Sequence, residues 1–187
     1  MNIRFHAFIF QIMALACFST ALMSAEPQTI PQQETPQNQR PTITELQFTP
    51  PQGWKFAETK DLPTSVKVMV VGKGTHEFPP SINVGTEAFT GTLKQYLKRV
   101  KEINTSKGNE WKDLGTITTQ AGEASLSQAD SKTQWGDIRM MHVILNQNNT
   151  IYIVTAAASK EDFPKFYKDF FNAFRSIRFN AQTTPSN

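Results

Sequence analysis

Apolar and polar residues alternate along two stretches in the first half of the chain, which is the period of a half-buried β-strand. Residues 65–71 place Val66, Val68 and Val70 on one face. Residues 81–89 repeat the pattern, and glycines interrupt the chain between the two stretches. The pattern therefore predicts two strands, 65–71 and 81–89.

The stretch 92–105 has the spacing of an amphipathic helix. Five apolar residues fall on one face: Leu93, Tyr96, Leu97, Val100 and Ile103. The basic residues of this region gather elsewhere on the helix or just after it: Lys94, Lys98, Arg99, Lys101 and Lys107. We interpret them as a solvated face. The alternative is contact with an acidic partner or with anionic lipid headgroups.

Four further strands are predicted after this helix. Residues 116–120 and 123–129 give weak strand patterns, whereas 137–146 is apolar on both faces, which indicates a central strand covered on both sides. Asn148-Asn149 suits a tight hairpin turn because asparagine tolerates positive φ. Residues 151–158 should then pair antiparallel with 137–146.

A second helix is predicted from about 161 to 175. Ser159 and Asp162 fit a capping box, and Pro164 then lies in the first turn. The helix carries a dense set of aromatic residues: Phe163, Phe166, Tyr167, Phe170, Phe171 and Phe174. We interpret this stripe as core packing, because such rings dominate buried area. A ligand-binding aromatic box is the alternative.

The N-terminal segment has the order of a secretory signal peptide. Arg4 precedes an uncharged apolar run from Ala7 to Met23, and small residues follow up to Ala25. We predict cleavage near Ala25, with a retained anchor as the alternative. Residues 1–25 are therefore interpreted as a signal peptide.

Cys17 allows a second interpretation of the same segment. Ala14-Leu15-Ala16-Cys17 resembles a bacterial lipobox, in which the cysteine is acylated. The apolar run continues beyond Cys17, however, where a lipoprotein would turn polar. We therefore favour a cysteine inside an ordinary signal and keep lipidation at Cys17 as the alternative.

The remainder of the chain divides by composition into three parts. Residues 26–44 are rich in Gln, Pro and Thr and bury too little apolar surface to fold, which predicts a linker. Residues 45–180 contain all the predicted elements and form one α+β domain. Residues 181–187 are a polar tail.

Composition and charge exclude several classes of protein. The 187 residues carry a formal net charge of only +3, which argues against a nucleic-acid partner. Cys17 is the one cysteine, so the predicted domain has neither a disulfide framework nor a cysteine-ligated zinc site. A cysteine-free exported domain suits a periplasmic compartment.

Short motifs follow one another in a fixed order along the predicted domain. They are Phe48, Pro51 and Gly53-Trp54 at its start, Gly122-Glu123-Ala124 and Asn149 to Thr155 in its second half, and Phe166 to Phe179 at its end. In this order they resemble the PsbP-like family, which includes extrinsic photosystem II subunits, a Ran-GTPase release factor and exported bacterial proteins. The resemblance implies an α/β/α sandwich whose central, mainly antiparallel sheet is flanked by helices. It also implies a binding role rather than catalysis.

Residues able to carry chemistry are few. His142 lies mid-strand, so we expect a hydrogen-bonded core histidine. His76 lies in a loop beside Glu77, and the pair falls short of the three or four ligands that a transition metal needs. Gly72-Lys73-Gly74-Thr75 lacks the spacing of a phosphate-binding loop, and no serine-hydrolase or zinc-protease motif occurs. We therefore predict no catalytic residues, no metal site and no cofactor.

The sequence thus predicts a periplasmic or secreted binding or scaffold module that recognises a protein or another envelope component. Its candidate binding residues are Trp135, which sits beside turn residues, together with His76 and Lys73. Membrane attachment is expected only through Cys17 or an uncleaved signal. The alternative function is an envelope hydrolase or metal-dependent enzyme using His76 with nearby carboxylates. The oligomeric state and the identity of the partner stay open.

Overall fold

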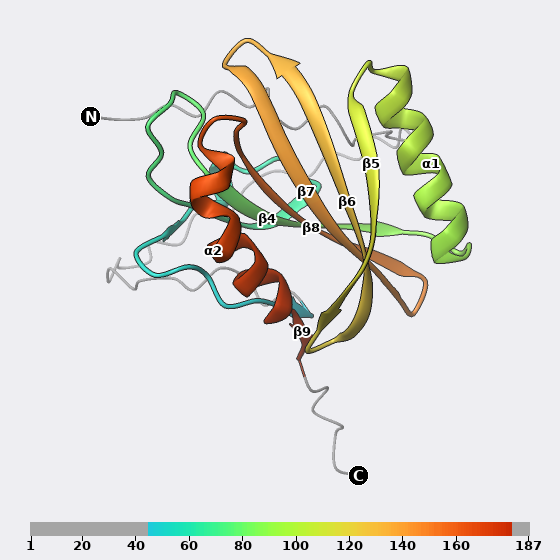
Figure 1. Cartoon of the computed structure of the whole chain (residues 1–187). Helices are drawn as coiled ribbons and strands as arrows, with labels where there is room; N and C mark the ends of the chain where they lie inside the picture. The colour runs from blue at the N-terminus through green and yellow to red at the C-terminus, as the bar shows by residue number, and fades with distance from the viewer. Residues whose placement is uncertain (1–44, 181–187) are drawn as a thin grey trace, which may run out of the picture.

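A twisted, fully antiparallel sheet forms the centre of the protein (Figure 1). The computed structural model describes residues 45–180. Its seven strands follow the order β2-β3-β4-β8-β7-β6-β5. Their bounds are β2 Lys55–Phe56, β3 Val66–Val71, β4 Ser81–Ala88, β5 Glu110–Thr119, β6 Gly122–Thr133, β7 Gly136–Gln147 and β8 Thr150–Ser159.

A second, two-stranded sheet joins the two ends of the described chain. β1 (Leu46–Gln47) pairs antiparallel with β9 (Arg178–Phe179). The Tyr152 hydroxyl donates a hydrogen bond to the Glu45 carboxylate, and the backbone amide of Asn180 donates to the Glu45 carbonyl. A short 3-10 turn, η2 (Thr59–Asp61), lies between β2 and β3. The first and last described residues therefore leave the domain at the same end.

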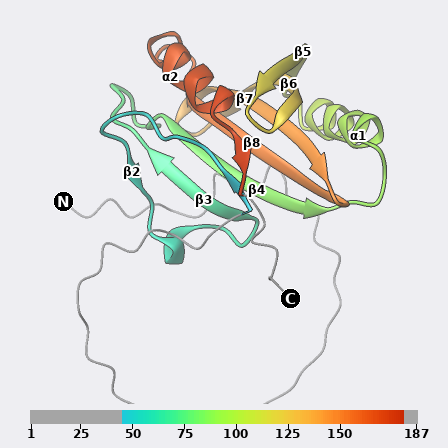
Figure 2. The same cartoon turned by 90° about the horizontal axis from the view of Figure 1, so that it is seen from below.

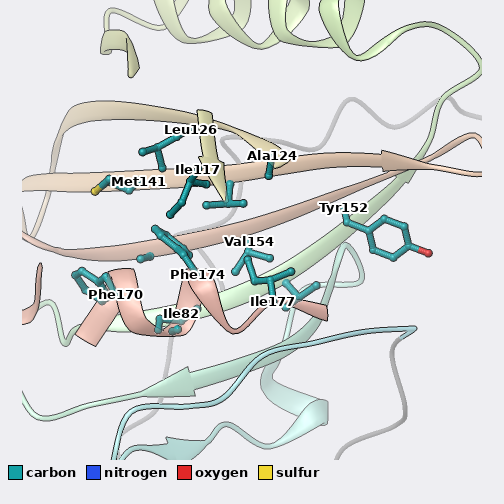
Figure 3. Packing of buried hydrophobic residues seen from close by; sticks show 14 of the residues in the cluster. Ile82, Ile117, Ala124, Leu126, Met141, Tyr152, Val154, Phe170, Phe174 and Ile177 are labelled. Carbon is teal, nitrogen blue, oxygen red and sulfur yellow. The ribbon is translucent and has the colours of Figure 1, made fainter. Parts of the chain in front are cut away.

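The larger hydrophobic core lies between the sheet and α2 (Phe163–Arg175). Phe170 and Phe174 are fully buried there, and Figure 3 shows both among side chains of the sheet. Val143 and Val154 reach this core from β7 and β8. Burying large rings and branched residues supplies most of the driving force for packing a helix on a sheet.

α1 (Leu93–Ser106) covers the opposite face. It begins at a complete capping box formed by Thr92 and Gln95. Its buried residues Tyr96 and Val100 pack against a cluster that includes Ile144 of β7. Ile144 and Val143 are neighbours in one strand and therefore point to opposite faces. The two helices lie on opposite faces of the sheet, and Figure 2 shows them well apart. The predicted α/β/α sandwich is confirmed.

The β7–β8 hairpin agrees closely with the sequence pattern. Asn148 and Asn149 form its turn with φ of 51° and 58°. β7 is buried on both faces between β6 and β8, as predicted. β5 is longer than the pattern at 116–120 indicates, because a register shift between Asp113 and Thr116 breaks its alternation. β6 also runs beyond the predicted 123–129, to Thr133.

The predicted signal peptide, linker, tail and Cys17 lie outside the described residues and stay predictions. Within residues 45–180, none of the helices has the length and apolar character needed to cross a membrane.

Candidate functional site

The loop between β3 and β4, residues 72–80, folds back over the end of the sheet. The Gly72 amide donates to the Pro80 carbonyl at 2.8 Å, which closes the loop at its base. Gly74 passes so close to its neighbours that a Cβ atom there would lie 2.8 Å from Pro80 Cδ and 3.2 Å from Asp162 Oδ2. Glycine at position 74 therefore allows the loop to approach Asp162.

Asp162 holds this loop in place. Its side chain is completely buried, and its Oδ1 accepts hydrogen bonds from Lys165 Nζ and Thr75 Oγ1, both at 2.6 Å. Its Oδ2 accepts from the Thr75 amide at 2.8 Å and lies 2.9 Å from His76 Nδ1. Lys165, Thr75 and His76 together hold the pKa of the Asp162 carboxyl well below its usual range. The carboxylate thus joins the loop to the start of α2.

The predicted capping box at Ser159 and Asp162 is wrong in one half. The Asp162 amide donates to Ser159 Oγ at 3.2 Å, but the Asp162 side chain makes no capping bond. Its carboxylate turns to Thr75 and His76, which lie far away in sequence. Charge-assisted hydrogen bonds to a buried carboxylate outweigh one local cap in free energy.

His76 contacts this cluster through one ring nitrogen, Nδ1. Its Nδ1 lies 2.9 Å from Asp162 Oδ2, 3.2 Å from Ser159 Oγ and 3.2 Å from Thr75 Oγ1. A serine–histidine–aspartate triad needs the serine and the aspartate on different ring nitrogens. Here both contact Nδ1, so His76 is not arranged to activate Ser159.

The carboxylate beside His76 is Asp162, not the neighbouring Glu77 considered from sequence. In the part of the chain that the structure describes, no group of three or more His, Cys, Asp or Glu residues is arranged to hold a metal ion. The geometry accordingly gives His76 a single carboxylate partner.

Trp135 lies at the same end of the sheet, in the turn between β6 and β7. Its backbone amide donates to Thr133 Oγ1 at 3.1 Å, and Gly136 adopts a φ of 95° to complete the turn. The half-buried indole packs on Phe78, with ring centroids 6.5 Å apart. Phe78 belongs to the same loop as His76, so the hairpin turn and the loop support each other.

Two of the three predicted binding residues are therefore brought together through Phe78, although 59 positions separate them in sequence. Lys73 lies exposed at the start of the same loop. We call Lys73, His76 and Trp135 the loop-end surface.

A charged cluster that the sequence analysis missed lies near this end. Arg139 donates two hydrogen bonds to Asp130, at 2.8 Å and 2.6 Å, and Lys160 Nζ lies 3.0 Å from the same carboxylate. Arg139 is the main cause of a lowered pKa at Asp130. Asp130 and Arg139 are direct partners in the β6–β7 register. Opposite charges at directly paired strand positions predict an ion pair, so this contact can be predicted once the register is known.

His142 is a buried core histidine, as predicted. Its Nδ1 shares a 3.0 Å hydrogen bond with Thr155 Oγ1, and burial lowers its pKa to about 4. The strand registers place it in one row of polar side chains across the sheet, with Asn83, Thr155 and Ser127. Ser127 Oγ and Trp111 Nε1 are the two buried side-chain polar atoms without a hydrogen-bond partner within residues 45–180.

The basic residues around α1 are largely engaged with neighbours. Arg99 forms a 3.0 Å ion pair with Glu87, and Glu87 also accepts a 2.9 Å hydrogen bond from the Tyr96 hydroxyl. Burial and this bond raise the pKa of Tyr96. Lys101 Nζ lies 5.9 Å from the centre of the Trp111 ring. Arg99 and Lys101 thus have partners within the domain.

Comparison with known proteins gives a match in structure only. No protein-family profile and no curated protein sequence matches the chain. The structure is similar to that of LpqN from Mycobacterium tuberculosis, described as involved in cell envelope biogenesis, with a TM-score of 0.55 and 11% identity over 77% of this chain and 87% of LpqN.

Two further similar structures were found at lower TM-scores. CyanoP, the cyanobacterial PsbP of Synechocystis sp. PCC 6803, gives a TM-score of 0.48 and 10% identity over 73% of this chain and 87% of CyanoP. The Saccharomyces cerevisiae Ran-binding protein Mog1p gives a TM-score of 0.49 and 16% identity over 72% of this chain and 90% of Mog1p. The chain has a PsbP-like α+β fold, and the resemblance drawn from its motifs is confirmed at the level of the fold.

Proposed function

We propose that this protein is an exported, non-catalytic binding module that recognises a protein or another component of the cell envelope through its loop-end surface. The observation that carries the proposal is the docking of loop 72–80. Asp162 anchors the loop at Thr75 and His76, and Phe78 rests on Trp135. Because the loop is already fixed at Asp162 and at Trp135, its exposed groups lose little conformational entropy when a partner binds.

The loop-end surface has residue types suited to recognition. Trp135 is a half-buried indole at a turn, and tryptophan is enriched among residues that dominate interface energies. Lys73 is exposed and His76 is partly exposed beside it, so both can donate hydrogen bonds to a partner.

Two features support a place in the envelope. The first 25 residues have the order of a signal peptide, which predicts a periplasmic or secreted protein, and the alternative is a lipid anchor at Cys17 that would hold the protein on the bacterial envelope. LpqN, which shares the fold, is described as involved in cell envelope biogenesis.

The geometry at His76 favours binding over the alternative of a hydrolase or metal-dependent enzyme. His76 has one carboxylate neighbour, and that carboxylate is buried and saturated with hydrogen bonds. A general base or a metal ligand needs an accessible lone pair aimed at substrate or ion. Both oxygens of the Asp162 carboxylate instead contact side chains or backbone of the loop and Lys165.

A site-specific crosslinking experiment tests the proposal. A photoreactive phenylalanine analogue replaces Trp135 in the full chain, and Leu114, which is 44% exposed on β5, receives the same analogue as a matched control. We expect the analogue at position 135 to give one crosslinked adduct of defined mass. The analogue at position 114 should give no adduct of that mass. Adding Lys73→Gln should reduce the yield of this adduct.

Two results would overturn the proposal. One is an identical adduct pattern at positions 135 and 114, which would mean unspecific collision. The other is a hydrolytic activity of the purified chain that disappears in His76→Gln, which would make the protein an enzyme.

A further inference from the structure

Helix α2 carries aromatic surface that the core does not use. Tyr167 is 51% exposed, although the sequence pattern assigned the whole aromatic stripe of this helix to the core. Phe163, Phe170 and Phe174 are buried as predicted. Tyr167 is not, because it lies one position beyond Phe166, on the side of the helix that turns away from the sheet.

This exposed ring packs against a neighbour on the same helix. Tyr167 stacks on Phe171, four residues later, with ring centroids 4.4 Å apart and planes tilted by 32°. The Arg175 guanidinium lies 5.5 Å from the centre of the Phe171 ring. The three side chains therefore form a continuous line along the helix at the spacing i, i+4, i+8.

Cations border this line. Lys168 is exposed next to Tyr167, and Lys165 remains 57% exposed although it pairs with Asp162. On the same helix the acidic residue is Asp169, which is half-buried. We call Tyr167, Lys168, Phe171 and Arg175 the α2 stripe. It combines two stacked rings with exposed positive charge.

Charge decides what can cover the α2 stripe. In an antiparallel pairing of two copies through α2, Arg175 of one helix would approach Lys165 of the other, and like charges repel. An anionic surface instead complements Lys168 and Arg175 directly. Tyrosine and basic side chains with apolar stems are the residues that settle at the boundary between headgroups and acyl chains.

We propose that the α2 stripe docks the domain on an anionic lipid surface, with Tyr167 and Phe171 inserted at the headgroup level and Lys168 and Arg175 against lipid phosphates. Tyr167 is exposed and Phe171 is half-buried against the core, so this helix face offers less apolar area than a stable protein interface requires. Shallow insertion into lipid needs only one helix face. This inference does not depend on a partner at the loop-end surface.

A fluorescent reporter of local polarity tests the inference in the full chain. Asn172 is exposed on α2 beside Phe171, and Asn172→Cys in a Cys17→Ser background receives a nitrobenzoxadiazole label. The matched control is Thr105→Cys, an exposed position on α1, the helix that carries lysines of its own. The probes are phosphatidylcholine vesicles with and without phosphatidylglycerol.

We expect the label at position 172 to brighten and shift to the blue on vesicles that contain phosphatidylglycerol, and to change little on phosphatidylcholine alone. The label at position 105 should stay in water on both. Adding Tyr167→Ser or Arg175→Gln to the Asn172→Cys chain should reduce the brightening at least threefold, and raising the salt concentration should reduce it further.

Because Tyr167, Arg175 and Asn172 are exposed, these variants should keep the thermal midpoint of the parent chain, which checks the fold. The inference fails if position 172 stays in water on anionic vesicles, as it would for a stripe that meets an acidic protein. It also fails if position 105 responds as strongly as position 172. Neither result bears on crosslinking at position 135.

Discussion

Acid should destabilise the fold through His142. The imidazole is buried and 6% exposed, and its pKa in the folded protein is about 4 against 6.5 in the unfolded chain. At a pH between these two pKa values, the His142 ring binds a proton in the unfolded state and not in the folded state. The stability that the neutral ring supports is therefore complete above pH 6.5 and is lost as the pH falls toward 4.

The size of this loss follows from the two pKa values. Their full difference corresponds to about 3 kcal/mol, and about 2.5 kcal/mol of it is already lost at pH 4.5. The folded protein lowers the pKa of Asp162 and of Asp130, and pH 4.5 lies above the ordinary aspartate pKa of 3.8, so their stabilising contributions are retained at that pH. At pH 4.5 His142 should dominate the acid response.

Urea unfolding at pH 7.0 and pH 4.5 measures this effect. His142→Gln keeps a side chain able to bond Thr155 but cannot titrate. The wild-type chain should lose about 2 kcal/mol more than the variant between the two pH values. Comparing the two differences cancels the contributions that both proteins share. Equal losses in both proteins would refute the reasoning, because they would mean that His142 does not resist protonation in the folded state.

Three further substitutions test the packing that positions the loop and α1, each measured as the free energy of unfolding in urea. Asp162→Asn should cost about 2–4 kcal/mol because it removes a buried charge bonded to Thr75, His76 and Lys165, and a cost near zero would mean that the loop is not held there. Gly74→Ala should cost about 1–3 kcal/mol through its clash with Pro80, and an unchanged midpoint would show that the loop can shift freely. Thr92→Ala should cost about 1 kcal/mol by removing the cap of α1, whereas Thr92→Ser should retain most of it.

The secondary structure was largely predictable because its signals are local. β7 alternates two apolar faces, and the structure buries both. The asparagines at positions 148 and 149 indicate a tight turn, and their positive φ values confirm it. The spacing along α1 gave the helix and its buried face. Each of these signals depends on residues a few positions apart, where backbone geometry alone decides the outcome.

The candidate site was predictable only in part. His76, Lys73 and Trp135 were chosen from sequence as loop residues, but nothing local shows that Phe78 joins the loop to the turn at Trp135. The sequence pattern indicates Asp162 as a capping residue. In the structure its carboxylate instead accepts a hydrogen bond from Thr75, which lies 87 positions away in the sequence. A sequence pattern cannot rank a local cap against a distant partner.

The sequence by itself determined the order and type of the elements, the central place of β7 and the core role of His142, because periodicity and turn chemistry act over short distances along the chain. The tertiary structure alone decided which charged side chains meet, as at Asp162 and at Asp130, and which ring of α2 stays outside. Those outcomes depend on strand register and on how far α2 covers the sheet. Both are set by packing the whole core at once, since the best arrangement of one helix depends on every surface it contacts.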